Sequence, residues 1–211
     1  MNKVDRGPRV FQKPWHSLAT LVVGVDEVGR GCLAGPVVSC ALSLKDDSID
    51  HQLFDSKSLK AQTREEITEL LSRNAVYAIG EASVEEIDQL NILQASLLSM
   101  ERAVSALQKK ISLKEALILV DGNKKIPGIP WAQQRAVIRG DSIYAPISAA
   151  SIVAKVYRDN LMKGLDVQFP NYAFGVHKGY GTSVHKEAIK AWGPSLVHRR
   201  SFKGVKEFFS F

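Results

Sequence analysis

Four acidic side chains stand at or just after the ends of apolar, strand-like stretches of this sequence. The acids are Asp26, Glu27, Asp121 and Asp141, and the stretches are residues 21–25, 116–120 and 136–138. Carboxylates gathered in one cleft repel one another unless a divalent cation compensates, and oxygen ligands of this kind suit Mg2+ or Mn2+. One strand-terminal acid is more often a cap or turn residue, but four acids in three such places favour a metal site.

The adjacent pair Asp26 and Glu27 is followed by a glycine-rich loop, residues 29–31. Neighbouring residues of a regular strand face opposite sides, so both acids serve one site only if the chain bends there, which glycine permits. The loop is either a plain hairpin turn or a segment whose backbone N–H groups and arginine contact a phosphate or a sugar. Its spacing to Gly35 is not a dinucleotide fingerprint, and the absence of a GxxxxGK[ST] motif gives an ATPase no support.

The elements that must position these acids are the strands and helices of one α/β domain. We expect strands at 21–25, 36–44, 75–79, 116–120 and 136–138, and helices at 63–73, 87–107 (one or two) and 148–161. The first two strands resemble a hairpin, and Thr63 and Glu66 have the spacing of a capping box at a helix start. Strands that come first and then alternate with helices indicate a mixed sheet.

Composition excludes several classes of protein. The chain has 211 residues, 45% of them hydrophobic and 24% charged, which suits a single folded core rather than disorder, collagen or a disulfide scaffold. Cys32 and Cys40 form no CxxC pair, so a structural zinc site is not expected and a reducing, cytoplasmic setting is. We expect no membrane association, because no apolar run is long enough to span a bilayer and the N-terminus lacks the core of a signal peptide.

Positive charge is concentrated at both ends of the chain. The net charge is +6, with an excess of positive charge in residues 1–20 and 177–211 and a slightly acidic middle. This distribution suits a polyanion held at the edges of a site that holds a cation, although a solvated, lysine-rich surface would give the same totals.

Seven blocks of the sequence resemble, in order, the motifs of bacterial ribonuclease HII, a type 2 ribonuclease H, over roughly residues 21–205. The blocks are GVDEVGRG (24–31), DSK (55–57), NIL (91–93), DGN (121–123), GDS (140–142), ISAASIVAKVYRD (147–159) and HKGY (177–180). Many ordered blocks are more specific than any single one. Cys32 stands where many relatives carry proline, which leaves the acids and glycines intact.

The resemblance implies a ribonuclease H-like α/β fold, with a five-stranded mixed sheet flanked by helices and a C-terminal helical extension from about residue 177. It divides the chain into a basic N-terminal arm, 1–20, and a catalytic domain, 21–211. The implied enzyme is a metal-dependent endonuclease that hydrolyses the RNA strand of RNA–DNA hybrids. It also incises 5′ of single ribonucleotides embedded in duplex DNA, leaving 3′-hydroxyl and 5′-phosphate ends.

The resemblance also implies the site residues. By position, Asp26, Glu27, Asp121 and Asp141 match the family's metal-binding acids, which would hold two Mn2+ or Mg2+ ions and activate water. Gly29, Arg30, Gly31 and Tyr180 match the residues that sense the 2′-hydroxyl, a group that both donates and accepts hydrogen bonds. An isolated tyrosine is more often a packing residue, but in the loop His-Lys-Gly-Tyr-Gly packing and substrate contact are equally good explanations of Tyr180.

Weaker expectations concern residues with ordinary structural alternatives. Further expected substrate contacts are Lys57, Ser148, Lys155, Arg158 and Lys178. Ser148 and Ser151 can equally cap or pack the helix that they begin. We expect His177, His185 and His198 in loops or at the surface, because they lack metal-ligand spacing.

The C-terminal residues 204–211 place three phenylalanines on a short basic tail. Packing against the domain is one explanation of this tail. Docking on a partner such as a sliding clamp is another, although the usual glutamine of clamp-binding peptides is absent. We expect a monomer.

Three other functions remain open at this point. Ribonuclease HIII usually carries an additional N-terminal substrate-binding domain, whereas about 20 residues precede the first expected strand here. A DNA junction resolvase of the same fold uses clustered acids but needs no 2′-hydroxyl. A non-catalytic nucleic-acid-binding module is disfavoured, because buried carboxylates weaken binding to phosphate.

Overall fold

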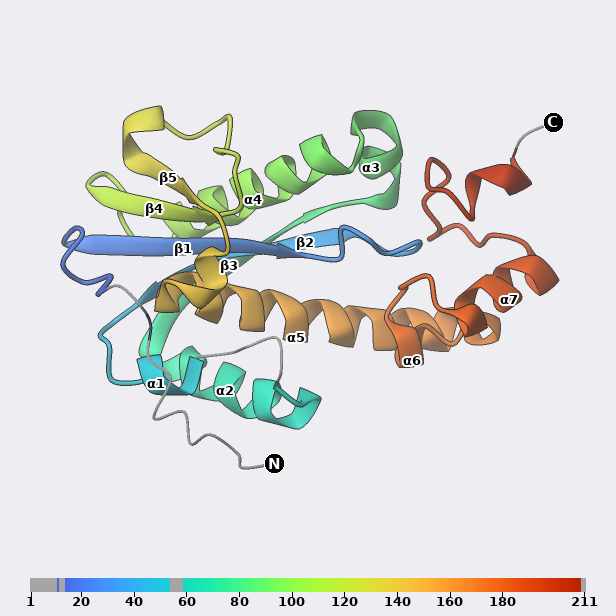
Figure 1. Ribbon diagram of the computed structural model, residues 1–211, viewed down its shortest axis with the longest axis horizontal. Coiled ribbons are helices and arrows are strands. Elements are labelled where there is room, and N and C mark those ends of the chain that lie inside the picture. Colours follow the sequence, from blue (N-terminus) through green and yellow to red (C-terminus); the bar gives the residue numbers. More distant parts are fainter. Residues whose placement is uncertain (1–10, 12–13, 54–58, 210–211) are drawn as a thin grey trace, which may run out of the picture.

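A five-stranded mixed sheet forms the centre of the computed structural model, which describes residue 11 and residues 14–53 and 59–209 (Figure 1). The strands are β1 (Leu21–Val28), β2 (Val37–Leu44), β3 (Ala75–Ala82), β4 (Ala116–Asp121) and β5 (Gln134–Val137). Their order is β3-β2-β1-β4-β5, antiparallel from β3 to β1 and parallel from β1 to β5. The predicted hairpin and the predicted mixed sheet are confirmed.

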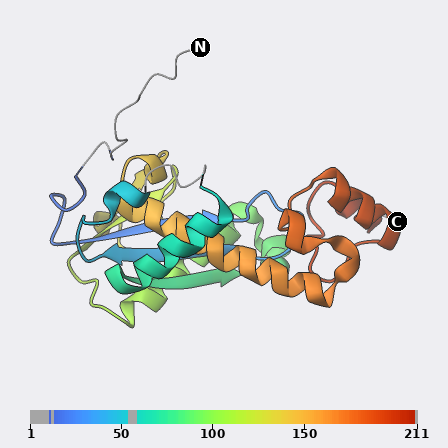
Figure 2. The ribbon, with the colours of Figure 1, turned by 90° about the horizontal axis from the view of Figure 1, so that it is seen from below.

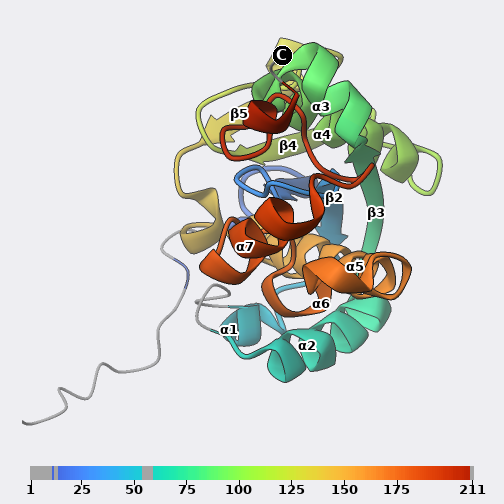
Figure 3. The same ribbon diagram turned by 90° about the vertical axis from the view of Figure 1, so that its right-hand side faces the viewer.

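Helices cover both faces of the sheet (Figures 1 and 3). One face carries α3 (Val84–Leu90) and α4 (Ile92–Gln108), and the other carries α1 (Asp50–Leu53), α2 (Ala61–Asn74) and α5 (Ala145–Gln168). Along β1, Val23 and Val25 pack into the core under α4, whereas Val22 packs into the core under α5. This alternation sends Asp26 toward the α5 side and Glu27 toward the α4 side.

Two glycines let helices lie directly on strands. A Cβ at Gly24 would lie 2.1 Å from the carbonyl carbon of Pro146, so α5 can rest on β1 only because this residue has no side chain. Gly80 gives α4 the same access to β3, since a Cβ there would lie 2.2 Å from the Ser99 carbonyl oxygen. The first of these contacts places the start of α5 on the middle of β1, two residues before Asp26.

The C-terminal part of the chain gathers at one end of the molecule (Figures 1 and 2). Its elements are η3 (Pro170–Tyr172), α6 (Phe174–His177), α7 (Ser183–Trp192) and η4 (Lys206–Phe208). Isolated bridges join Cys32 to Tyr180 and Ala34 to His198, so this region pairs with the loop that follows β1. The expected C-terminal helical extension is confirmed.

Several element boundaries differ from the predicted ones. The capping box expected at Thr63 and Glu66 is wrong, because α2 starts earlier and its N-cap, Lys60, makes no side-chain cap. A capping box occurs instead at α3, between Ser83 and Glu86. Helix α5 begins near Pro146, whose fixed φ suits a first helical turn, rather than at residue 148. Among the described residues, the other two 3-10 turns are η1 (Trp131–Gln133) and η2 (Gly140–Ser142).

The structure also bears on the expectations about the two cysteines and about membrane association. Cys32 and Cys40 are both buried free thiols. In the described residues, no helix combines the length and the hydropathy needed to cross a membrane.

Candidate active site

A cavity of about 390 Å3 lies at the carboxyl ends of β1 and β4. It is lined by Asp26, Glu27, Val28, Gly29, Arg30, Gly31, Arg64, Asp121, Ser151, Ile152, Lys155 and Tyr180. These residues come from β1, its following loop, α2, β4, α5 and the C-terminal extension. The fold thus brings together three of the four expected acids, the glycine-rich loop and Tyr180.

The two adjacent acids reach this site from opposite faces of β1. Glu27 also lines a second cavity of about 110 Å3 on the α4 side, and Asp121 lines both cavities. Strand β1 stays regular through Val28, and the chain turns only at Gly29, where φ is +94°. The expectation that a bend must bring the two acids together is therefore corrected, because both acids line one cavity with Asp121 although β1 stays regular through them.

Burial and mutual repulsion destabilise the charged forms of the acids. Burial, followed by the charges of Glu27 and Asp121, raises the pKa of Asp26 well above its ordinary value. Hydrogen bonds from Ser151 and from the Glu27 N–H (2.8 Å to Oδ1) oppose that rise. Burial also raises the pKa of Glu27, although Arg30, 3.1 Å from its carboxylate, partly offsets it.

Gly140 contacts one of the other two acids, Asp121, and directly precedes the other, Asp141, in the sequence. The Gly140 N–H donates to Asp121 Oδ1 at 2.6 Å and fixes the end of β4 against η2. Asp141 follows directly in η2, is buried, and lines neither of these two cavities. Across residues 14–53 and 59–209, no three His, Cys, Asp or Glu side chains already form a group that could hold a metal ion.

The donor set nevertheless fits a hard divalent cation. Asp26, Glu27 and Asp121 offer only oxygen ligands at one cavity, as Mg2+ and Mn2+ prefer. Their mutual repulsion, expressed in the raised pKa of Asp26, is the cost that a cation would remove.

Tyr180 and Lys155 form one wall of the cavity. Tyr180 is 41% exposed and lines the cavity, and Lys155 Nζ lies over its ring, 5.7 Å from the centroid. Lys155 also donates to Asp159 at 2.6 Å. Arg64 of α2 completes this wall, a residue that sequence reasoning missed because an arginine on a helix has the same pattern as a solvated one.

Three of the expected substrate contacts lie elsewhere. Ser148 is fully buried and donates to the Leu53 carbonyl, so its hydroxyl packs α5 rather than contacting phosphate. Arg158 is fully buried and donates to three main-chain carbonyls, which gives it a structural role instead of the expected phosphate contact. Lys178 Nζ donates to the Gly175 carbonyl and does not line the cavity. Lys57 lies outside the described residues.

Comparison with known proteins decides the family. The family model described as Ribonuclease HII matches residues 23–205 of this chain. The chain belongs to the ribonuclease HII family. A ribonuclease HII of Nitrosococcus oceani is 49% identical over 192 residues, which cover 90% of this chain and 92% of the relative. This chain is therefore a ribonuclease H, an endonuclease that hydrolyses the RNA strand of RNA–DNA hybrids.

Solved structures share the fold of this ribonuclease HII. RNase HII from Archaeoglobus fulgidus, solved in a complex with PCNA, has a TM-score of 0.71 and 24% identity, covering 87% of this chain and 95% of that chain. Bst-RNase HIII in complex with Mn2+ has a TM-score of 0.76 and 18% identity, covering 92% and 71%. At these identities the likeness supports the ribonuclease H fold alone.

Three histidines of this ribonuclease HII are buried, which corrects their expected surface placement; His177 and His185 lie in helices, and His198 lies in a loop. His185 Nδ1 donates to the Tyr180 carbonyl at 2.9 Å, because a carbonyl can only accept. Its Nε2 then accepts from His198 Nε2 at 3.0 Å, and His198 Nδ1 accepts from the Ser195 N–H. His177 accepts from the Gly179 N–H. Neutral histidines thus support the loop that carries Tyr180, a role that their spacing does not reveal.

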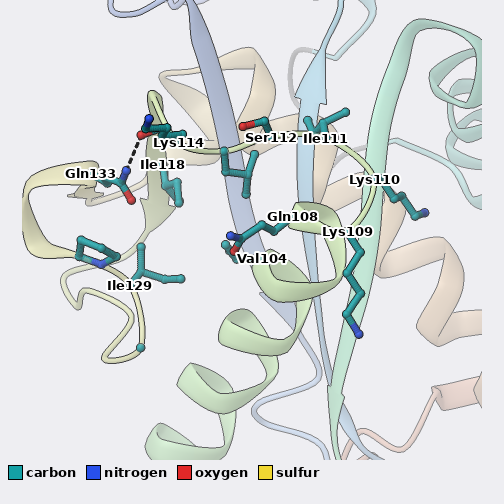
Figure 4. A pocket seen from close by; sticks show the side chains of 13 residues that line it. Val104, Gln108, Lys109, Lys110, Ile111, Ser112, Lys114, Ile118, Ile129 and Gln133 are labelled. Atoms are coloured by element: carbon teal, nitrogen blue, oxygen red, sulfur yellow. Dashed lines mark hydrogen bonds between the residues drawn. The ribbon is translucent and has the colours of Figure 1, made fainter.

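A larger cavity lies away from the acids of this ribonuclease HII. It has about 630 Å3 and lies at the carboxyl end of α4, where Lys109, Lys110, Lys114, Val104 and Ile118 are among the lining residues (Figure 4). No carboxylate lines it. This larger cavity therefore lacks the carboxylates needed for metal-assisted phosphodiester hydrolysis, which line the smaller cavity at β1 and β4.

Proposed function

We propose that this ribonuclease HII incises 5′ of single ribonucleotides in duplex DNA as well as within RNA–DNA hybrids, at the cavity between β1 and β4. One observation carries the proposal: Asp26, Glu27 and Asp121 share a cavity with the 29–31 loop and Tyr180. Acids suited to cation-assisted hydrolysis thus lie beside a main-chain loop suited to contact with a ribose.

The acids Asp26, Glu27, Asp121 and Asp141 would hold two divalent cations, Mn2+ or Mg2+. When bound, such cations supply a Lewis acid and a means of activating water at neutral pH. The chain's own groups orient the ligands: the Glu27 N–H holds Asp26, Arg30 holds Glu27, and the Gly140 N–H holds Asp121. Asp141 adjoins Gly140, which supports its assignment to the same end of the sheet. The fold-related RNase HIII was solved with Mn2+, as an observation on that protein.

The 29–31 loop would contact the ribose at the junction. Gly31 is exposed at the cavity, and a Cβ placed there would meet no protein atom within 4 Å. Packing within the protein therefore does not require glycine at this position, whereas close approach of a sugar does. Backbone groups can hydrogen-bond a 2′-hydroxyl where DNA offers only hydrogen.

Tyr180, Lys155 and Arg64 would hold the remainder of the nucleotide. The partly exposed Tyr180 offers a surface to the sugar, and the positively charged side chains of Lys155 and Arg64 suit the adjacent phosphates. The contact expected of Lys57 stays a prediction, as do the monomeric state, the cytoplasmic location and the division at residue 20.

The direct test is cleavage of an end-labelled DNA duplex that contains one ribonucleotide, beside an all-DNA duplex, with Mg2+, Mn2+ or a chelator. The expected result is metal-dependent incision 5′ of the ribonucleotide only, abolished by Asp26→Asn or Asp121→Asn. Cutting of both duplexes would identify a resolvase-like nuclease. Binding without cutting, unaffected by divalent metal, would identify a non-catalytic module.

Two variants test ribose recognition. Gly31→Ala should fold with unchanged thermal stability but lose cleavage, because its methyl group projects into open space at the cavity. Tyr180→Ala should reduce cleavage at a lone ribonucleotide more than it reduces duplex binding. Equal losses of both for Tyr180→Ala, or normal cleavage by Gly31→Ala, would limit these residues to structural roles.

The C-terminal residues 206–209 support a second proposal, docking on a sliding clamp. Phe208 and Phe209 are 42% and 39% exposed on and beside the short helix η4. The archaeal RNase HII of the same fold was solved in a complex with PCNA. Deleting residues 207–211 should abolish clamp binding and leave cleavage intact. Lowered thermal stability with unchanged clamp binding would show instead that the tail only packs.

A further inference from the structure

Arg199 is fully buried against the 29–31 loop, and its guanidinium donates to three main-chain carbonyls. Its Nη1 donates to Arg30 at 2.8 Å and its Nη2 to Gly29 at 2.7 Å, while Nε and Nη2 donate to Gly35 at 3.0 and 2.8 Å. Burial lowers the pKa of Arg199 to about 10, so the guanidinium stays charged at neutral pH. A buried cation is costly, and these carbonyls offset that cost only while the loop keeps its present shape.

The backbone around Arg199 is fixed from two sides. Arg199 N–H donates to the Leu33 carbonyl at 2.9 Å, and Gly35 N–H donates to the Val197 carbonyl at 2.8 Å. From α3, the carboxylate of Asp88 accepts from the Arg200 and Ser201 N–H groups, both at 2.9 Å. The guanidinium is therefore held against residues 29–31 by a segment that is itself hydrogen-bonded to the later part of the same loop, between β1 and β2, and to helix α3.

The carbonyl contacts determine where the loop's N–H groups point. The described residues contain no cis peptide bond. In a trans peptide the carbonyl of one residue and the N–H of the next point in opposite directions. Since Arg199 draws the carbonyls of Gly29 and Arg30 toward itself, the N–H groups of Arg30 and Gly31 turn away from it. The loop lines the cavity, so these N–H groups are presented on that side.

We propose that Arg199 is a positioning residue for ribose recognition, which directs the Arg30 and Gly31 N–H groups toward the 2′-hydroxyl by holding the preceding carbonyls. This inference rests on the proposed function of the 29–31 loop. Lysine should not replace Arg199, because one ammonium cannot reproduce a planar fork that spans three carbonyls.

The test is a pair of affinities measured in chelator, so that nothing is cut: one for a DNA duplex with a single ribonucleotide and one for the all-DNA duplex. Arg199→Lys should lower the ratio of the two affinities by roughly 10-fold, the value of one lost hydrogen bond, without changing the all-DNA affinity. With Mg2+, kcat should fall by roughly 100-fold, as for a reacting group misplaced by about 1 Å.

Two further variants keep the result interpretable. Arg102→Lys is the matched control, because Arg102, like Arg199, donates to a main-chain carbonyl. Arg102 lies at the exposed surface of α4, where it also donates to the Glu86 carboxylate. Arg102→Lys should leave the affinity ratio unchanged. If Arg199→Lys does not fold, Asp88→Asn weakens the anchor of the same segment from outside and should lower the ratio in the same direction by a smaller factor.

The possible outcomes separate the inference from the function on which it rests. If Gly31→Ala loses the affinity ratio while Arg199→Lys and Asp88→Asn keep it and only melt earlier, Arg199 is structural and the inference is overturned. If the wild-type enzyme shows no ratio, or Gly31→Ala retains it, ribose recognition by the loop fails and the inference fails with it. Loss of the ratio in Gly31→Ala and Arg199→Lys, but not in Arg102→Lys, supports both.

Discussion

At the scale of single residues, burial and the mutual repulsion of neighbouring carboxylates destabilise the charged form of Asp26. Asp26 is buried, and the charges of Glu27 and Asp121 add to the effect of burial in raising its pKa. A carboxyl whose pKa is higher in the folded than in the unfolded protein stabilises the fold only at low pH, and this stabilisation is lost as pH rises through the folded value. At neutral pH Asp26 therefore lowers the free energy of unfolding when no cation is bound.

Asp26→Asn should accordingly raise the thermal stability of the metal-free protein at pH 7. The amide oxygen can still accept from the Glu27 N–H, so the local geometry is kept. A gain of 1 kcal/mol corresponds to roughly 2–4 °C for a chain of this size. Scanning calorimetry in chelator would measure it, with the exposed Asp46→Asn as a control that should bring no gain. Equal or lower stability of Asp26→Asn would contradict the proposed repulsion.

At the scale of elements, the approach of α5 to β1 places Ser151 beside Asp26. That approach depends on Gly24, because an added Cβ would meet the backbone of Pro146 and Ile147 at 2.1–2.4 Å. Backbone atoms cannot rotate aside as a side chain can. The geometry of the acids is thus tied to a helix–strand contact that β1 makes two residues before Asp26.

Gly24→Ala should therefore destabilise the fold by about 3 kcal/mol or more, at the upper end of overpacking costs. Gly164→Ala on the exposed side of the same helix is the matched control, since its Cβ would meet nothing within 4 Å. Alanine in a helix interior favours folding by about 0.5–1 kcal/mol relative to glycine, so this control should be more stable. Urea unfolding compares the two, and similar effects of both variants would refute the role given to Gly24.

At the scale of the whole molecule, the C-terminal extension is joined to the catalytic sheet by buried polar groups. Neutral histidines support the Tyr180 loop, and buried arginines bind the carbonyls of the loop after β1. Burial lowers the pKa of His185 and of His198 to about 4. Their unfolded forms take up protons from about pH 6.5 downward. Stability present above that pH is therefore lost as the pH falls toward 4.

The expected slope from each of these histidines is at most about 1.4 kcal/mol per pH unit. The raised pKa of Asp26 acts in the opposite direction, so the Asp26→Asn background shows the histidine effect most clearly. In that background, the free energy of unfolding between pH 6.5 and 4.5 should fall less steeply after His198→Gln. The exposed His51→Gln should leave the slope unchanged. An unaltered slope in His198→Gln would show that His198 is not held neutral.

The sequence by itself determined the family, the mixed sheet and the residues whose chemistry is local. Asp26, Glu27 and Asp121 follow from strands that end in acids, and the 29–31 loop follows from its glycines. Tertiary structure alone decided which charged and polar residues face the cavity. Arg158 and Ser148 are buried away from the cavity, whereas Arg64 lines it. The buried histidines support the loop that carries Tyr180, and Arg199 supports the 29–31 loop. The physical reason is distance along the chain: Arg199 meets carbonyls 164–170 residues away, and no local pattern encodes such a partner.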